Sequence, residues 1–163
     1  LQPWRNGSNI VIAMQRQDSE QWHGLPPMNQ WLESTVAEIR KHSDRPIVIR
    51  PHPRSGCNIP SGCLIDRPQF NAGSYDDFDF DRVLESAHCV VNWNSGPGSQ
   101  AVIAGVPAFV GPSSLASPIA NWDLSQIENP PRSERSVWLE QLAHTEWTVE
   151  EIRSGLPFKR LVF

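Results

Sequence analysis

The stretch "VVNWNSGPGSQAVIAGVPAFV", from Val90 to Val110, decides the fold. It begins with an apolar run, breaks at glycines, continues as a short helical segment and ends in a second apolar run. Continuous apolar runs are typical of strands that are buried on both faces of a sheet. A strand, a helix and a strand in this order predict a βαβ unit with parallel strands.

The rest of the chain repeats this alternation. Apolar runs predict strands at residues 9–15, 46–50, 63–67, 88–93 and 107–110, and helical spacing predicts helices at 28–43, 79–87, 98–104, 133–144 and from 148 to about 155. Alternating strands and helices indicate an α/β fold. We therefore expect a Rossmann-like parallel sheet with helices on both faces, in one domain of residues 1–163.

Composition limits the classes of function. The net charge is −4 and no basic run stands out, so we expect no nucleic-acid surface. No apolar stretch is long enough for a membrane span. The odd count of three cysteines favours reduced thiols and a cytoplasmic location, and leaves a Cys57–Cys63 disulfide as the minor alternative. Because the sequence lacks an initiator Met, we expect a fragment or a processed piece.

The glycine-rich turn is the first candidate site. In such sheets, ligands bind beyond the carboxyl ends of the strands. Gly96 and Gly98 would let a ligand approach the backbone, and Ser95 and Ser99 would add hydroxyl donors. The amides at the start of the helix, those of Ser99, Gln100 and Ala101, favour an anion. The alternative is a tight turn in which Ser99 merely caps the helix.

A dinucleotide is disfavoured at this turn. Gly96 to Ala101 match the fingerprint G-x-G-x-x-A, which requires an acidic residue at the end of the next strand to hold a ribose. Here that strand ends "FVGPSS", without an acid. We therefore do not expect NAD.

The second candidate site is "RPHPR", directly after the strand at 46–50. Pro51 and Pro53 restrict the backbone, so that Arg50, His52 and Arg54 are presented with little entropy left to lose. Two guanidiniums and an imidazole suit a phosphate. Each of them alone is as well explained as a surface charge or a packed turn residue. Together with the glycine-rich turn at the same edge of the sheet, they favour a diphosphate or phosphodiester ligand.

Other chemistries have weaker support. His52, Cys57 and Cys63 lack the C-x-x-C pair of a typical zinc site, so we expect no metal. The turn also lacks the G-x-S-x-G elbow of a serine hydrolase. The acids of "YDDFDFD", which are Asp76, Asp77, Asp79 and Asp81, are expected to be solvated loop or helix-start charges.

The chain resembles the C-terminal, donor-binding half of a GT-B glycosyltransferase, and most closely the capsule polysaccharide synthesis transferases of the Kdo and sialyl kind. Arg50-Pro51-His52-Pro53 matches the R-x-H-P segment of these families. Ser95 to Ala101 match their S-G-x-x-x-E-A turn except at Gln100, and Gly105-Val106-Pro107 matches the following G-x-P.

The resemblance implies a metal-independent donor site without a further cofactor. His52, Arg50 and Arg54 would bind the phosphate of a nucleotide-sugar from one side, and Ser95, Ser99 and the helix start from the other. Gln100 stands where the families have a glutamate that accepts ribose hydroxyls, which makes ribose recognition the open question. The acceptor and the catalytic base would belong to a missing N-terminal GT-B domain.

Two alternatives to a glycosyltransferase donor domain stay open. An isomerase like the nucleotide-sugar 2-epimerases shares the phosphate motifs but needs acidic groups near the sugar. A non-catalytic module that binds a nucleotide or phosphate needs none.

Overall fold

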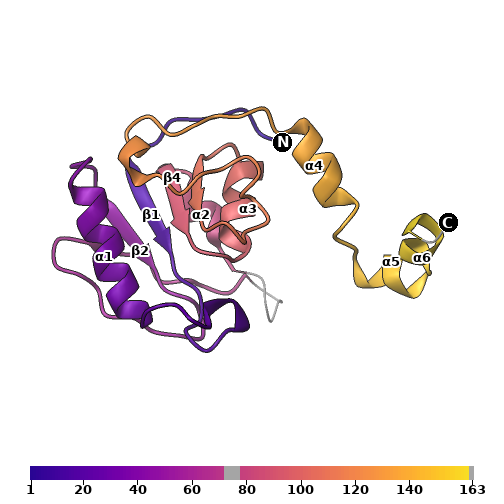
Figure 1. Cartoon of the computed structure of the whole chain (residues 1–163), viewed down its shortest axis with the longest axis horizontal. Helices are drawn as coiled ribbons and strands as arrows, with labels where there is room; N and C mark the ends of the chain where they lie inside the picture. The colour runs from indigo at the N-terminus through magenta and orange to yellow at the C-terminus, as the bar shows by residue number, and fades with distance from the viewer. Residues whose placement is uncertain (72–77, 162–163) are drawn as a thin grey trace. The chain divides into compact units, whose positions relative to one another are not determined.

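The computed structural model describes residues 1–71 and 78–161. The chain divides into two compact units, Leu1–Ser133 and Glu134–Phe163. The expected domain of residues 1–163 spans both units, and the sheet lies in the first. Figure 1 follows the chain through both.

The first unit is built on a parallel sheet. The strands within the described residues are β1 (Asn9–Ala13), β2 (Ile47–Arg50), β3 (Leu64–Ile65), β4 (Ala87–Asn92) and β5 (Ala108–Val110), and every pairing between them is parallel. Their order is β3-β2-β1-β4-β5. The chain thus builds outward from β1 to β3, then returns past β1 to form β4 and β5. This places the topological switch point between β1 and β4, where ligands of such sheets bind.

Helices cover both faces of the sheet. Helix α1 (Met28–Arg40) lies on one face, and α2 (Phe80–Leu84) and α3 (Gly96–Ile103) lie on the other, as Figure 1 shows. Two short 3₁₀ helices, η1 (Glu20–Trp22) and η2 (Leu124–Gln126), lie in loops. The α/β prediction of a Rossmann-like parallel sheet is confirmed.

The core explains why the strands are continuously apolar. Successive side chains of a strand point to opposite faces. Ile10 and Ile12 of β1 join a buried cluster with Leu32 and Ile39 of α1, while Val11 between them is fully buried on the other face. A sheet covered on both faces favours apolar residues on both sides of its strands, and the central residues of β1, β2 and β4 are apolar and buried.

Four tryptophans complete the α1 side of the core. Trp22, Trp31, Trp93 and Trp122 form a closed ring of contacts, with ring centroids 5.2 to 6.5 Å apart. The buried indole of Trp22 anchors the polar segment that contains it, and its Nε1 donates to the carbonyl of Pro26 at 2.9 Å. The loop after β1 is therefore fixed rather than merely solvated.

The second unit contains the helices α4 (Ser136–Ala143), α5 (Val149–Arg153) and α6 (Leu156–Leu161). Thr148 and Glu151 form a capping box at the start of α5: the Thr148 side chain accepts from the Glu151 amide, and the Glu151 side chain accepts from the Thr148 amide. The helix predicted from 148 to about 155 is confirmed as α5, but α6 was not expected: Gly155 takes a positive φ of 74°, and α6 begins directly after it. In the described part of the chain, no helix has the length and apolar character needed to cross a membrane.

Candidate functional site

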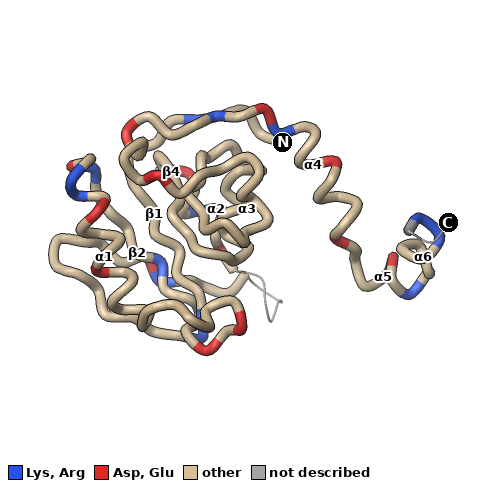
Figure 2. The backbone as a smooth tube through the Cα atoms, in the orientation of Figure 1, with Lys and Arg blue, Asp and Glu red and all other residues tan. Residues whose placement is uncertain are grey.

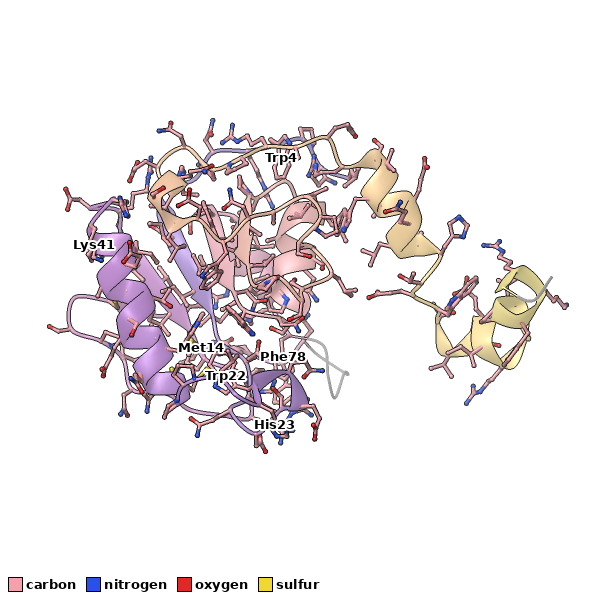
Figure 3. All side chains as sticks on the ribbon, viewed as in Figure 1. Trp4, Met14, Trp22, His23, Lys41 and Phe78 are labelled. Atoms are coloured by element: carbon pink, nitrogen blue, oxygen red, sulfur yellow. The ribbon has the colours of Figure 1, made fainter. Side chains whose placement is uncertain are left out.

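A cavity of about 580 Å³ opens at the carboxyl edge of the sheet. Ala13 and Met14 at the end of β1 lie between the two predicted loops, and both loops contribute to the lining. The cavity-lining residues among those predicted are Arg50, His52, Arg54, Ser95, Gly96 and Gln100. The expectation that the two loops meet at one site is therefore confirmed. Figure 3 labels Met14 and Phe78, which both line this cavity.

His52 lies in the turn after β2, where its carbonyl accepts from the Ser55 amide at 3.0 Å. The Arg54 amide donates to Nδ1 of the ring at 3.1 Å. An accepting Nδ1 carries no proton, so the neutral ring holds its proton on Nε2. The turn thus sets the tautomer that makes His52 a hydrogen-bond donor, which suits a phosphate oxygen.

Arg50 is tied to carboxylates of the protein. Its side chain is only 5% exposed, and it bonds to Asp66 and to Oδ1 of Asp79, the latter at 2.7 Å. Its guanidinium also lies over the ring of Phe80, 5.5 Å from the centroid. Two anions therefore already neutralise the cation that the sequence suggested as a direct phosphate ligand. Arg50 lines the cavity, and its main contacts are the ion pairs with Asp66 and Asp79 that stabilise the cavity wall.

Asp79 and Asp66 complete this network with Arg82. Nε of Arg82 donates to Asp79 at 2.8 Å, and Nη2 donates to Asp66 at 2.5 Å. Burial alone raises the pKa of Asp79, but the Gln69 amide and both guanidiniums bond to the carboxylate and hold its pKa well below the usual range. Asp79 stands at the start of α2, as one of the two expected alternatives had it, but it is not a solvated acid, because β2 brings a buried arginine to it.

Ser95 is held in place by a residue that the sequence analysis did not single out. Asn92, fully buried at the end of β4, donates to the Ala13 carbonyl and to Oγ of Ser95, each at 2.9 Å, and its Oδ1 accepts from the Ser95 amide at 3.0 Å. Gln15 adds a bond from the Asn94 amide to its Oε1 at 3.0 Å. These amides fix the turn to the end of β1. A polar residue closing the apolar run "HCVVN" was the available signal for Asn92.

Helix α3 begins two residues earlier than predicted, at Gly96, and Ser95 is its N-cap residue. Its first turn therefore presents the amide of Gly96, because Pro97 has no amide hydrogen and the Gly98 amide donates to the Ser95 carbonyl at 3.3 Å. The amides of Gln100 and Ala101 lie further inside the helix. Proline in the first turn is favourable because its fixed φ suits a helix start. The predicted helix tip is thus present, with a shifted set of donors.

Gly98 and Ser99 do not line the cavity. Both are buried, and a Cβ on Gly98 would lie 2.8 Å from Cγ1 of Val110. Gly98 therefore lets α3 pack closely against the end of β5, and the expectation that it leaves room for a ligand was wrong. Gly96 has that room, since its nearest neighbour would be the Gln100 side chain at 3.6 Å.

The remaining lining comes from the segment before and within α2. It supplies apolar groups, Pro68, Phe78 and Phe80, and one exposed carboxylate, Asp81. Gln100 is exposed on the α3 side. Asp76 and Asp77, also considered in the sequence, lie outside the described residues.

A second cavity, of about 380 Å³, is lined by residues that precede β1 and β2, by His88 near the start of β4, and by residues 128–130 and 132. Its Arg45 bonds to Glu128 at 3.0 Å, and its Arg132 bonds to the Arg5 carbonyl and the Asn6 side chain. Because this cavity lies at the amino ends of the strands, away from the switch point, the first cavity is the candidate site.

Acidic and basic residues are interspersed along the chain (Figure 2).

The described residues contain no cluster of three or more metal-ligating side chains, and all three cysteines are free. No protein-family model and no curated protein matches this sequence.

Proposed function

We propose that this chain is the donor-binding domain of a glycosyltransferase and binds the phosphates of a nucleotide-sugar in the cavity at the carboxyl edge of the sheet. One observation carries the proposal. The donor tautomer of His52 and the start of α3 line the same cavity beside the β1–β4 switch point. Both are groups that bind anions without a metal ion.

The proposed chemistry is leaving-group stabilisation. When the glycosidic bond to the donor phosphate breaks, negative charge grows on the phosphate oxygens. The Nε2–H of His52 and the Gly96 amide at the start of α3 then stabilise the transition state more than the ground state, which lowers the barrier. Arg54 adds positive charge at the rim, and Arg50 holds the wall through Asp66 and Asp79. The acceptor and the catalytic base are assigned to a separate GT-B domain.

The experiment is calorimetric titration of the chain with CMP, CDP, UDP and GDP. We expect at least one of them to bind, and His52→Ala to weaken that binding about 10- to 100-fold, as expected for the loss of one hydrogen bond to a charged group. His42→Ala is the matched control, since His42 follows α1 and pairs with Glu38. The absence of binding by every nucleotide, or equal binding by both variants, would contradict the proposal.

A non-catalytic phosphate-binding module is the second candidate. It is favoured by the ion pairs that neutralise Arg50, because they leave less positive charge for a developing anion than the motif suggests. Product analysis decides between the two. If the chain, together with an acceptor domain, transfers sugar from a nucleotide-sugar, it is a glycosyltransferase donor domain. A non-catalytic phosphate-binding module would transfer none.

A further inference from the structure

The cavity has different chemistry along the edge of the sheet. Over β2, β1 and β4 the lining contains the hydrogen-bond donors His52, Arg54 and the start of α3, among apolar residues that include Ala13 and Met14. The segment that follows β3 and enters α2 supplies Pro68, Phe78, Phe80 and Asp81 instead. A ligand that fills the cavity therefore meets donors at one end, and apolar surface with a carboxylate at the other.

Asp81 differs from the acids around it. Asp66 and Asp79 are each bonded to both Arg50 and Arg82. Asp81 is exposed in the first turn of α2 and is the one carboxylate among the described lining residues. It forms no ion pair with any described residue. The guanidiniums of Arg50 and Arg82 pair with Asp66 and Asp79 instead, and Asp81 lines the cavity, where its carboxylate can accept hydrogen bonds from a ligand.

A carboxylate in this position determines which chemical group of a ligand can lie next to it. It repels a phosphate and accepts hydrogen bonds only, so its complement is a group with O–H or N–H donors. Hydroxyls form short, charge-assisted hydrogen bonds with an ionised carboxylate.

The aromatic residues next to Asp81 indicate where those hydroxyls come from. Phe78 packs against Phe70 with ring centroids 4.5 Å apart and also lines the cavity, so it is a supported ring against which a flat heterocycle can stack. In a nucleotide, the ribose lies between the base and the phosphates. A base at Phe78 and phosphates at His52 would put the ribose between these two ends, near Asp81.

The dimensions agree with this placement. Neighbouring strands lie about 4.8 Å apart, so the edge from β3 to β4 spans about 14 Å, enough for a base, a ribose and phosphates in line. The volume of about 580 Å³ is that of an ordinary small-molecule site.

We propose that Asp81 accepts hydrogen bonds from the ribose hydroxyls of the bound nucleotide, which makes the site selective for ribonucleotides over deoxyribonucleotides. This inference rests on the proposed function. The carboxylate of Asp81 on α2 would give the ribose hydroxyls a charged acceptor, whereas Gln100 on α3 offers only a neutral amide oxygen.

The test compares each ribonucleotide with its 2′-deoxy form. CDP, UDP and GDP are titrated against dCDP, dUDP and dGDP, with the whole chain as wild type, Asp81→Ala and Asp81→Asn. The control is Asp44→Ala, an exposed acid between α1 and β2. In the wild type we expect the ribonucleotide that binds to do so about tenfold more tightly than its deoxy form. In Asp81→Ala the two should bind alike, and in Asp81→Asn the ratio should lie between.

Inorganic pyrophosphate separates this role from a general effect on folding. It occupies only the phosphate end, so Asp81→Ala should bind it at least as tightly as the wild type, while His52→Ala should bind it more weakly. Equal affinity of the wild type for ribo- and deoxyribonucleotides, or an unchanged ratio in Asp81→Ala, overturns the inference and leaves the proposed function standing. If none of the ribonucleotides binds, the proposed function fails and this inference fails with it.

Discussion

The two glycines in the first turn of α3, Gly96 and Gly98, have different surroundings, although both belong to the glycine-rich motif. A Cβ at Gly98 would lie 2.8 Å from Cγ1 of the buried Val110, whereas a Cβ at Gly96 would have only the end of the Gln100 side chain at 3.6 Å. The same substitution at the two positions therefore separates the cost of packing from the intrinsic preference for alanine over glycine in a helix.

We expect Gly98→Ala to lower the free energy of unfolding by about 1 to 3 kcal/mol, because the extra methyl group overpacks the contact between α3 and β5. Gly96→Ala is expected to change it by less than about 1 kcal/mol, since it adds a methyl group in open space at the first helical position. Urea denaturation of both variants measures the difference. Equal stabilities would contradict the packing role of Gly98.

Single residues also show which features of the candidate site could be predicted from the sequence. The proline-stiffened turn and the glycine-rich turn were placed at one edge because each directly follows a strand, and parallel strands end together. The partners of Arg50 could not be predicted in this way. Asp66 and Asp79 are 16 and 29 positions away in the sequence, and only the paths of β3 and α2 bring them to the guanidinium.

At the scale of the elements, the network of two arginines and two aspartates joins the end of β2 to the loop after β3 and to α2. Arg50 comes from β2, Arg82 from α2, Asp66 from the residue after β3, and Asp79 from the N-cap of α2. All four charges are paired, and the side chains of both aspartates are at most 15% exposed. This network fixes the wall of the cavity that carries Phe80 and Asp81.

Asp79→Asn should lower the free energy of unfolding at pH 7 by about 3 kcal/mol, because it removes a charge that faces a buried guanidinium. The folded pKa of Asp79 lies below its unfolded value near 3.8, so its ionisation stabilises the fold above that pH and this contribution is lost as the pH falls below it. The variant should therefore lose less stability than the wild type between pH 7 and pH 3. Urea unfolding at both pH values tests this, with Asp44→Asn as the control. Parallel losses in wild type and variant would refute it.

Element boundaries were the less predictable part of the fold. The continuous apolar runs identified the strands because both faces of the sheet are covered. The start of α3 was misplaced by two residues because Gly96 and Pro97 read as turn residues, although proline fits the first turn of a helix. The extra helix α6 was missed because the glycine and proline at positions 155 and 157 indicate a stop. There they mark the junction between two short helices.

At the scale of the whole molecule, the sheet, the buried hydrophobic cluster and every residue that lines the candidate cavity belong to Leu1–Ser133. The second unit has much less to stabilise it by itself. Its helices α5 and α6 are five and six residues long, and it exposes Val137, Val149, Ile152 and Phe158. Helices this short are marginal in water unless their apolar side is packed.

We therefore expect a chain that ends at Ser133 to unfold cooperatively and to bind the same nucleotide as the whole chain, with an affinity within about twofold. A peptide of residues 134–163 should show little helix, because 30 residues without a disulfide or metal rarely form a stable core. Thermal unfolding and calorimetric titration of the shortened chain, and circular dichroism of the peptide, provide the measurements. If the shortened chain folds but loses the nucleotide, the binding site extends beyond the first unit. If it fails to fold, the second unit stabilises the sheet.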